Sequence, residues 1–286
     1  MSVALFKPQV WSAQILAGLD EALVYAQPQI VNRDYEGEIT SQGQSVRIVT
    51  IGDPSIFPYK SGDTINYEDI DTAGLDLPID QGDAFAFKLD DVDKAQVALN
   101  PMLKTTQRAA RKLAAQADRY VASLYTGVAP SNVVGSTGSP INITTSPKDA
   151  WDKVLIPLRT KLNRSNVPAM DRYVVVSPEF TGALLQDDRF VRVDASGSEQ
   201  GLRNGIVGRA AGFDVLESNV TPVPSGDTQV IQAGYPGALT FVDQILETEA
   251  LRLESTIADA VRGLHVYGAK LLRPEGIAVA YVDPSA

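Results

Sequence analysis

The sequence predicts an α+β fold organised around one long helix. Residues 95–126 carry apolar side chains three, four or seven positions apart, as expected for a helix with one buried face. Residues 147–235 alternate helix-like and strand-like segments, while residues 45–94 and 238–282 contain runs rich in β-branched and aromatic residues. The length of 286 residues corresponds to about two domains.

The composition excludes several classes of protein. There is no cysteine, which rules out disulfides, thiolate zinc sites and thiol nucleophiles, and a single histidine leaves little room for a metal cage. The net charge of −10 argues against a general nucleic-acid binder. Apolar runs stay far below the ~18 residues of a membrane helix, and residues 1–10 lack a signal-peptide pattern. We therefore expect a soluble, unsecreted protein without a membrane partner.

Charge is concentrated in two neighbouring segments. Residues 53–93 contain eleven acids against two lysines, a net charge of −9, and the segment that follows is basic with one acid, Asp118. We call its five cations the basic stripe: Lys104, Arg108, Arg111, Lys112 and Arg119. One interpretation is that both segments are solvated surfaces. The other is that the acidic segment meets a basic surface on another subunit, since complementary charge fixes the register of a contact.

The first 44 residues are predicted to form an arm. Apolar residues recur at helical spacing between Trp11 and Leu23, so we expect a short amphipathic helix that ends before Pro28. Residues 29–43 are polar and irregular. A helix this short cannot form a domain alone, and we expect it to dock elsewhere.

Residues 45–94 are predicted to form a long β-hairpin. In this interpretation the β-branched run 45–51 pairs with 84–89, where large apolar residues alternate with alanine and lysine. About thirty residues rich in Gly and Pro separate the two runs, which is long for a connection without structure. Because a two-stranded ribbon is only marginally stable alone in water, its apolar side chains must be covered by the rest of the chain or by a neighbouring copy. The candidate inter-subunit contacts are Phe57, Tyr59, Lys60, Tyr67, Asp69 and Asp71.

The predicted long helix has signals at both ends. Asn100 is placed to cap it, Pro101 suits its first turn, and Gly127 stops it. At ~1.5 Å per residue the helix would be about 40 Å long, enough to act as a spine. The segment 127–147 is rich in Gly, Ser, Thr and Pro, which predicts a linker with a short strand at 141–143 and a domain boundary near its end.

The second half of the sequence predicts an α/β unit followed by returning strands. A helix from Ser146 is expected to kink at Pro157, and Ser177 is expected to cap a second helix after a buried strand at 173–176. Five glycines between positions 197 and 212 predict a mobile loop or a cluster of turns. The remaining predicted strands cover 213–216, 228–233, 238–242, 249–253, 264–269 and 276–282.

Catalytic motifs are absent from the sequence. There is no G-x-S-x-G elbow or phosphate-binding loop, and the glycines after residue 200 are too widely spaced for G-x-G-x-x-G. His265 lies in a strand-like setting, which favours a packed or surface histidine over a general base. The acidic run 90–93 lacks the glycine and the spaced acids of a calcium loop. A carboxylate dyad has no spacing rule and stays open, but the sequence as a whole predicts no enzyme, no cofactor and no metal.

Three local patterns carry a family resemblance. They are 175–180 (VVSPEF) followed by 184–190 (LLQDDRF), then 205–208 (GIVG) with 212–215 (GFDV) and 218–222 (SNVTP), and finally 249–253 (EALRL) with 276–280 (GIAVA). In this order and spacing the chain resembles the major capsid protein of tailed bacteriophages, whose fold is shared with bacterial encapsulins. The resemblance covers residues 9–282 and implies the phage major-capsid fold.

The resemblance also implies a domain map and a set of partners. The regions would be an N-terminal arm (1–44), an extended β-hairpin loop over the adjacent subunit (45–94), a peripheral domain with the spine helix (95–146), an axial α/β domain (147–235) and strands returning to the peripheral domain (236–286). The chain would form hexamers and pentamers of an icosahedral shell around double-stranded DNA, in a virion assembled in the host cytoplasm. We also expect a portal and a separate scaffolding protein, because no fused scaffold precedes the arm.

Other functions remain open from the sequence. An encapsulin-like compartment has the same fold, an α/β enzyme with an acidic lid over 52–83 would be a small particle, and a minor tail or decoration protein would not close on itself. The basic stripe would face either packaged DNA or an acidic neighbour. Some relatives cross-link their shells through a loop lysine, for which Lys60 is the sole candidate between positions 41 and 87, and no acceptor pattern accompanies it.

Overall fold

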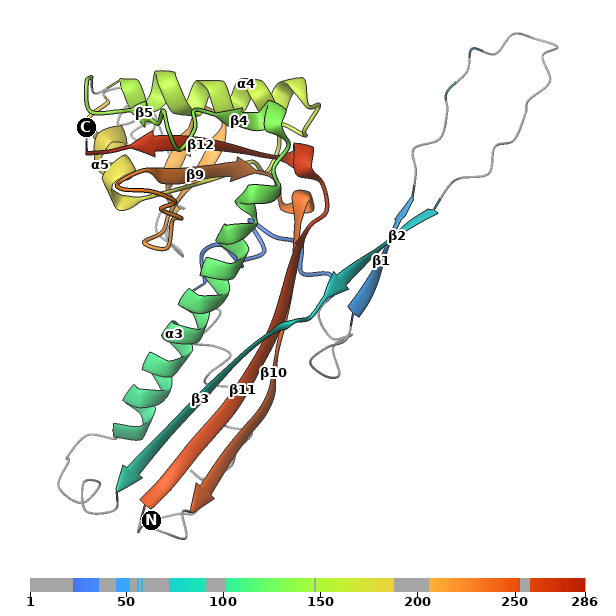
Figure 1. Cartoon of the computed structure of the whole chain (residues 1–286), viewed down its shortest axis with the longest axis vertical. Coiled ribbons are helices and arrows are strands. Elements are labelled where there is room, and N and C mark those ends of the chain that lie inside the picture. The colour runs from blue at the N-terminus through green and yellow to red at the C-terminus, as the bar shows by residue number, and fades with distance from the viewer. Residues whose placement is uncertain are drawn as a thin grey trace.

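The computed structural model describes residues 23–35, 45–51, 56, 58, 72–90, 101–146, 148–187, 206–252 and 258–285. These residues form a compact α/β block, a long sheet that runs beside one long helix, and a two-stranded ribbon that projects from the sheet (Figure 1). The helix predicted between Trp11 and Leu23 lies almost wholly outside the described residues, as does most of segment 197–212. None of the described helices is long and apolar enough to cross a membrane.

Helix α3 (Pro101–Ser123) connects the two parts of the fold. Its buried face belongs to one apolar cluster that also contains residues of both sheets and of the N-terminal segment 23–31. The helical members of this cluster are Ala110, Leu113, Ala114, Ala117, Val121 and Ala122. The predicted helix is confirmed: it begins at Pro101, and a 3₁₀ turn (Leu124–Gly127) follows it.

A three-stranded antiparallel sheet runs along α3. Its strands, in order across the sheet, are β10 (Leu239–Arg252), β11 (Ala258–Leu271) and β3 (Gln81–Asp90). Successive side chains of a strand point to opposite faces, and each face has a different cover. Phe241 and Tyr267 pack in the cluster around α3, whereas Val242 and Val266 pack against the ribbon.

The N-terminal segment 23–35 is fastened to α3 and to β10. Asp118 of α3 accepts hydrogen bonds from the backbone N–H groups of Val24 (2.8 Å) and Ala26 (3.0 Å). Asn32 exchanges two backbone hydrogen bonds with β10, at Leu239 (2.8 Å) and Phe241 (3.0 Å). The described end of the arm therefore docks on its own chain.

A mixed seven-stranded sheet forms the α/β block, in the order β4–β12–β9–β6–β8–β7 with β5 also paired to β12. Its strands are β4 (Val133–Val134), β5 (Ile141–Asn142), β6 (Tyr173–Val176), β7 (Ile206–Ala210), β8 (Phe213–Glu217), β9 (Gln229–Gly234) and β12 (Ile277–Asp283). Helices α4 (Ile156–Arg164) and α5 (Pro178–Leu185) cover one face. The other face joins the cluster around α3.

Local sequence signals act as predicted in this block. Ser177 caps α5 by accepting the N–H of Phe180 at 3.2 Å, and Pro178 occupies the first turn. The irregularity expected at Pro157 takes the form of a π-helical stretch (Ala150–Leu155) that leads into α4, because proline has no N–H to donate to the preceding turn.

The predicted pairing of 45–51 with 84–89 is wrong. Strand β1 (Ser45–Ile51) pairs with β2 (Thr72–Pro78) to form the ribbon, and β3 pairs instead with β11. The patterns identified both strands but not their partners, because strand β2 contains Gly74 and Pro78, residues that are depleted in strands.

One prediction about the last strands is also wrong. Residues 239–252 form one strand instead of two, continued across a register shift between Ile245 and Glu247. Strand β12 pairs with the earlier strands β9, β4 and β5 in the α/β block, where its near-continuous apolar sequence is buried. Strand β7 also replaces the end of the predicted loop 197–212.

We predict that Asp118 makes stability depend on pH. Burial raises the pKa of this carboxyl from 3.8 to about 6, although hydrogen bonds from the backbone of Val24, Ala26 and Tyr25 oppose the rise. The folded chain therefore binds this proton more tightly than the unfolded chain, and the Asp118 contribution to the free energy of unfolding rises by up to about 3 kcal/mol as the pH falls from about 7 to about 4.

Urea unfolding of the wild type and of Asp118→Asn at two pH values measures this effect. The stability difference, wild type minus variant, is expected to increase on acidification, because asparagine does not titrate. A difference that stays constant with pH would contradict the prediction.

Candidate assembly interface

The end of the ribbon that contains Ile48, Leu77 and Ile79, which we call its foot, packs on the long sheet. Ile48 of β1, Leu77 of β2 and Ile79 are at most 3% exposed and lie in one cluster with Val242 and Val266. Burial of a side chain of this size contributes about 1.5–3 kcal/mol. The apolar side chains of the ribbon were expected to be covered either by the rest of the chain or by a neighbouring copy. At the foot of the ribbon, the rest of the chain covers them.

Beyond its foot the ribbon leaves the body of the molecule. Figure 1 shows β1 and β2 running away from α3 and from the α/β block. Ile56, between the two strands, is 97% exposed. The candidate contacts Phe57, Tyr59, Lys60, Tyr67, Asp69 and Asp71 lie outside the described residues, so their roles stay predictions.

The basic stripe lies on the outer surface of α3. Its described side chains, all exposed, are Arg108, Arg111, Lys112 and Arg119. The last three follow Arg108 by three, four and eleven positions, which places all four on one side of a helix. Lys104 belongs to the same helix, but its side chain is outside the described part. Asp118, the one acid of this stretch, is 1% exposed, so the outward surface of these turns is basic.

Two tyrosines bind acids at the joint between β2 and β3, which comprises residues 79–80 and the first residues of β3. Tyr267 of β11 donates to Asp83 at 2.8 Å, and Tyr120 of α3 donates to Asp80 at 3.3 Å. Burial raises the pKa of both tyrosines, and the neighbouring carboxylates raise it further. Both hydroxyls are therefore protonated donors at neutral pH, and they fix the joint to the helix and to the sheet.

A buried charged cluster ties the N-terminal segment to the long sheet. Asp243 of β10 accepts a hydrogen bond from Nη2 of Arg33 at 2.6 Å, and its other oxygen lies 3.2 Å from Nε2 of His265. Burial alone would raise the pKa of Asp243, but the hydrogen bond with His265 and the charge of Arg33 together lower it. His265 is fully buried, so the sole histidine is a packed residue, one of the two roles predicted for it.

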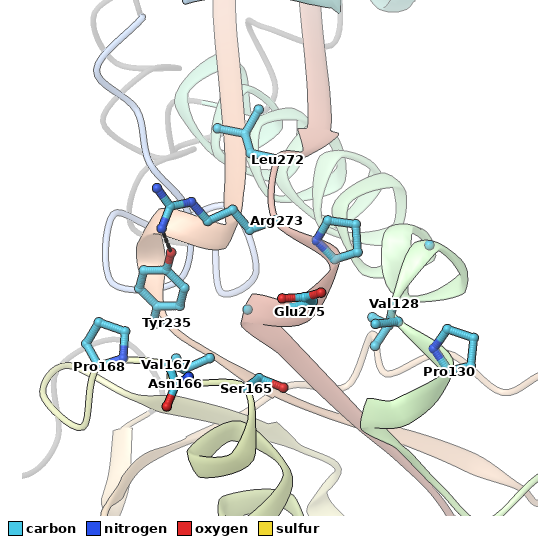
Figure 2. A pocket seen from close by; sticks show the side chains of 14 residues that line it. Val128, Pro130, Ser165, Asn166, Val167, Pro168, Tyr235, Leu272, Arg273 and Glu275 are labelled. Atoms are coloured by element: carbon cyan, nitrogen blue, oxygen red, sulfur yellow. Dashed lines mark hydrogen bonds between the residues drawn. The ribbon is translucent and has the colours of Figure 1, made fainter. Parts of the chain in front are cut away.

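A cavity of about 610 Å³ lies where the α/β block meets the end of α3 (Figure 2). Tyr235 and Arg273 line it and share a hydrogen bond of 3.2 Å, and Glu275 is its one carboxylate. The lining contains no histidine to act as a base. Within the described residues, no three His, Cys, Asp or Glu side chains gather as a metal site requires.

Comparison with known proteins identifies the family. A family model described as phage capsid protein matches residues 74–280. A chain from a structure of Mycobacterium phage Che8 is 33% identical, with a TM-score of 0.66 and 90% of each chain covered. This protein belongs to the phage capsid protein family. It is a structural subunit of the virion shell, which assembles from copies of the chain.

More distant structures agree in fold alone. The capsid of Ralstonia phage GP4 has a TM-score of 0.69 at 10% identity, covering 92% of this chain and 90% of that chain. The holo-SrpI encapsulin complex from Synechococcus elongatus PCC 7942 has a TM-score of 0.52 at 12% identity, covering 87% of this chain and 85% of that chain. None of the curated proteins compared with the sequence matches it. The resemblance to phage capsid proteins noted in the sequence is thus confirmed.

Sequence reasoning missed the inward position of Asp118. Its place among five cations indicates a surface position, because it is the one acid of that basic segment. Helical spacing was the signal that could have placed it: with Ala114, Ala117 and Val121 it makes a face with intervals of three, four and seven. An acid on an apolar face requires buried partners, and the N–H groups of Val24 and Ala26 are those partners.

We predict that Asp243→Ala destabilises the subunit by about 3 kcal/mol, because it leaves His265 and Arg33 without the carboxylate that both contact. Chemical unfolding of unassembled subunits measures the loss. Asp76→Ala, an exposed acid of β2, serves as control and should change stability by less than about 0.5 kcal/mol. Equal effects of the two substitutions would show that the cluster contributes nothing.

Proposed function

We propose that this capsid protein forms the hexamers and pentamers of an icosahedral shell that encloses double-stranded DNA. The observation that supports this most is the position of the ribbon. It is anchored on one face of the long sheet while α3 covers the other face, and its far end points away from the subunit (Figure 1). Contacts between two different surfaces of identical copies are heterologous, and they close into rings when the rotation permits.

In this proposal the ribbon, within the loop 45–94, lies over the adjacent subunit. Helix α3 is the spine of the peripheral domain, and the α/β block is the axial domain. In the same proposal β10 and β11 belong to the peripheral domain and β12 to the axial domain, which is supported by the sheets in which they pair. The neighbouring subunit would then cover the predicted contact residues of the loop, because their own chain covers only the foot of the ribbon.

The proposal extends to partners that work with the shell. A portal and a separate scaffolding protein would act during assembly in the host cytoplasm, and the subunit itself would perform no catalysis. An encapsulin-like compartment is the second candidate, favoured by the similarity to the encapsulin fold. The two candidates differ in content, because a virus shell encloses nucleic acid and a compartment encloses an enzyme.

We predict that the purified protein forms closed shells of megadalton mass when examined by negative-stain electron microscopy and light scattering. Shells isolated from infected cells should contain DNA that resists nuclease until they are opened. A packaged enzyme in place of DNA would favour the compartment. A particle below ~150 kDa, about five copies of a 30.7 kDa chain, would contradict the shell.

Variants of the basic stripe separate its two predicted partners. If the stripe faces DNA, Arg108→Ala with Arg111→Ala leaves the assembly of empty shells unchanged and lowers the amount of DNA packaged, because fewer cations neutralise phosphate. Gln116→Ala, exposed on the same helix, is the control. An equal loss of empty-shell assembly would assign the stripe to a contact between subunits.

A further inference from the structure

The ribbon crosses the long sheet at one glycine. Strand β3 pairs with β11 as far as Gln81 opposite Tyr267. The next residues, Asp80 and Ile79, leave the sheet edge, and the chain passes over the face that Gly268 occupies. A Cβ added to Gly268 would overlap the carbonyl oxygen of Pro78 and lie 3.1 Å from Cα of Ile79.

Space, and not backbone conformation, requires glycine at this position. Gly268 is absent from the residues with positive φ, so its backbone suits any amino acid. The atoms that a side chain would meet are backbone atoms of Pro78 and Ile79, which cannot rotate away as a flexible side chain would. A methyl group at position 268 would therefore lift or turn the chain that crosses it.

Two further contacts hold the crossing on the same face. Nζ of Lys270, two residues along β11, donates a hydrogen bond of 2.7 Å to the backbone oxygen of Asp76 in β2. Ile79 and Leu77 are buried beside Val266 and Val242. The crossing is thus fixed by a close approach, a hydrogen bond and apolar packing, all on the sheet face opposite α3.

We propose that the crossing at Gly268 and Lys270 sets the direction in which the ribbon leaves the subunit, and that Gly268 is a positioning residue for shell assembly. The second half of this inference rests on the proposed role of the ribbon in covering a neighbour. A closed shell repeats the same contact many times, so every subunit must present its ribbon in the same direction. A small rotation at the foot is amplified along the length of the ribbon.

The absence of cysteine allows a direct test in the unassembled subunit. Spin labels on Ile56→Cys and Met170→Cys, which are 97% and 78% exposed, report the distance from the ribbon to the α/β block. With Gly268→Ala we expect this distance distribution to shift or broaden while circular dichroism stays that of a folded protein. Gly182→Ala is the control, because the added Cβ has no atom within 4 Å apart from its own chain neighbours and the backbone of its own helix.

Assembly is measured with the same variants. We expect Gly268→Ala to lower the assembled fraction about tenfold. A misaligned ribbon contact cannot form at the same time as the other contacts of the subunit, so the gain in affinity from simultaneous contacts is lost. If Gly268→Ala does not fold, Lys270→Met decides, because it removes the hydrogen bond to Asp76 without adding bulk to the crossing. A broadened distance and reduced assembly with Lys270→Met would support the inference.

Either of two results overturns the inference: an unchanged distance distribution in the folded variants, or wild-type assembly despite a redirected ribbon. Ile56→Asp keeps the foot intact and tests the proposed contact by itself. If that variant assembles normally, the ribbon does not cover a neighbour, and the distance measurement still decides whether Gly268 directs it.

Discussion

The long three-stranded sheet has two apolar faces, and both must be kept from water. The chain covers them with segments that are far apart in sequence. Helix α3 and the N-terminal segment cover the face of Phe241 and Tyr267, and the foot of the ribbon covers the face of Val242 and Val266. Strand β11 is the middle strand and contacts both the helix and the ribbon, so the position of the helix and the direction of the ribbon both depend on it.

The apolar cluster around α3 joins the two parts of the fold. Residues of the helix, the long sheet and the α/β block share this cluster, and small side chains on the buried face of the helix allow close packing. Polar groups reinforce this arrangement at its edges. Asp118 holds the backbone of residues 24–26, and Asp243 holds Arg33, so the N-terminal segment is bound at both ends.

Local features were predictable from the sequence, and long-range pairing was not. The start of α3 at Pro101, the cap of α5 by Ser177 and the strand at 173–176 all followed from short-range chemistry that the sequence displays directly. The partner of strand β1 did not, since any strand-like run nearby satisfies the same pattern. Gly268 gave no local signal either, because its requirement comes from Pro78, a residue far away in the chain. The function was inferred from the family resemblance, whereas the contacts of individual residues could be identified only in the structure.

A cryo-electron microscopy reconstruction of the assembled shell tests the central claim most directly. We propose that each subunit anchors its ribbon on its own long sheet and that an adjacent subunit covers the far end. Density for Ile56 buried against an adjacent subunit, with Ile48 and Leu77 still packed on their own sheet, is the expected result. Density that places Ile56 in solvent, or folded back onto its own chain, would contradict it.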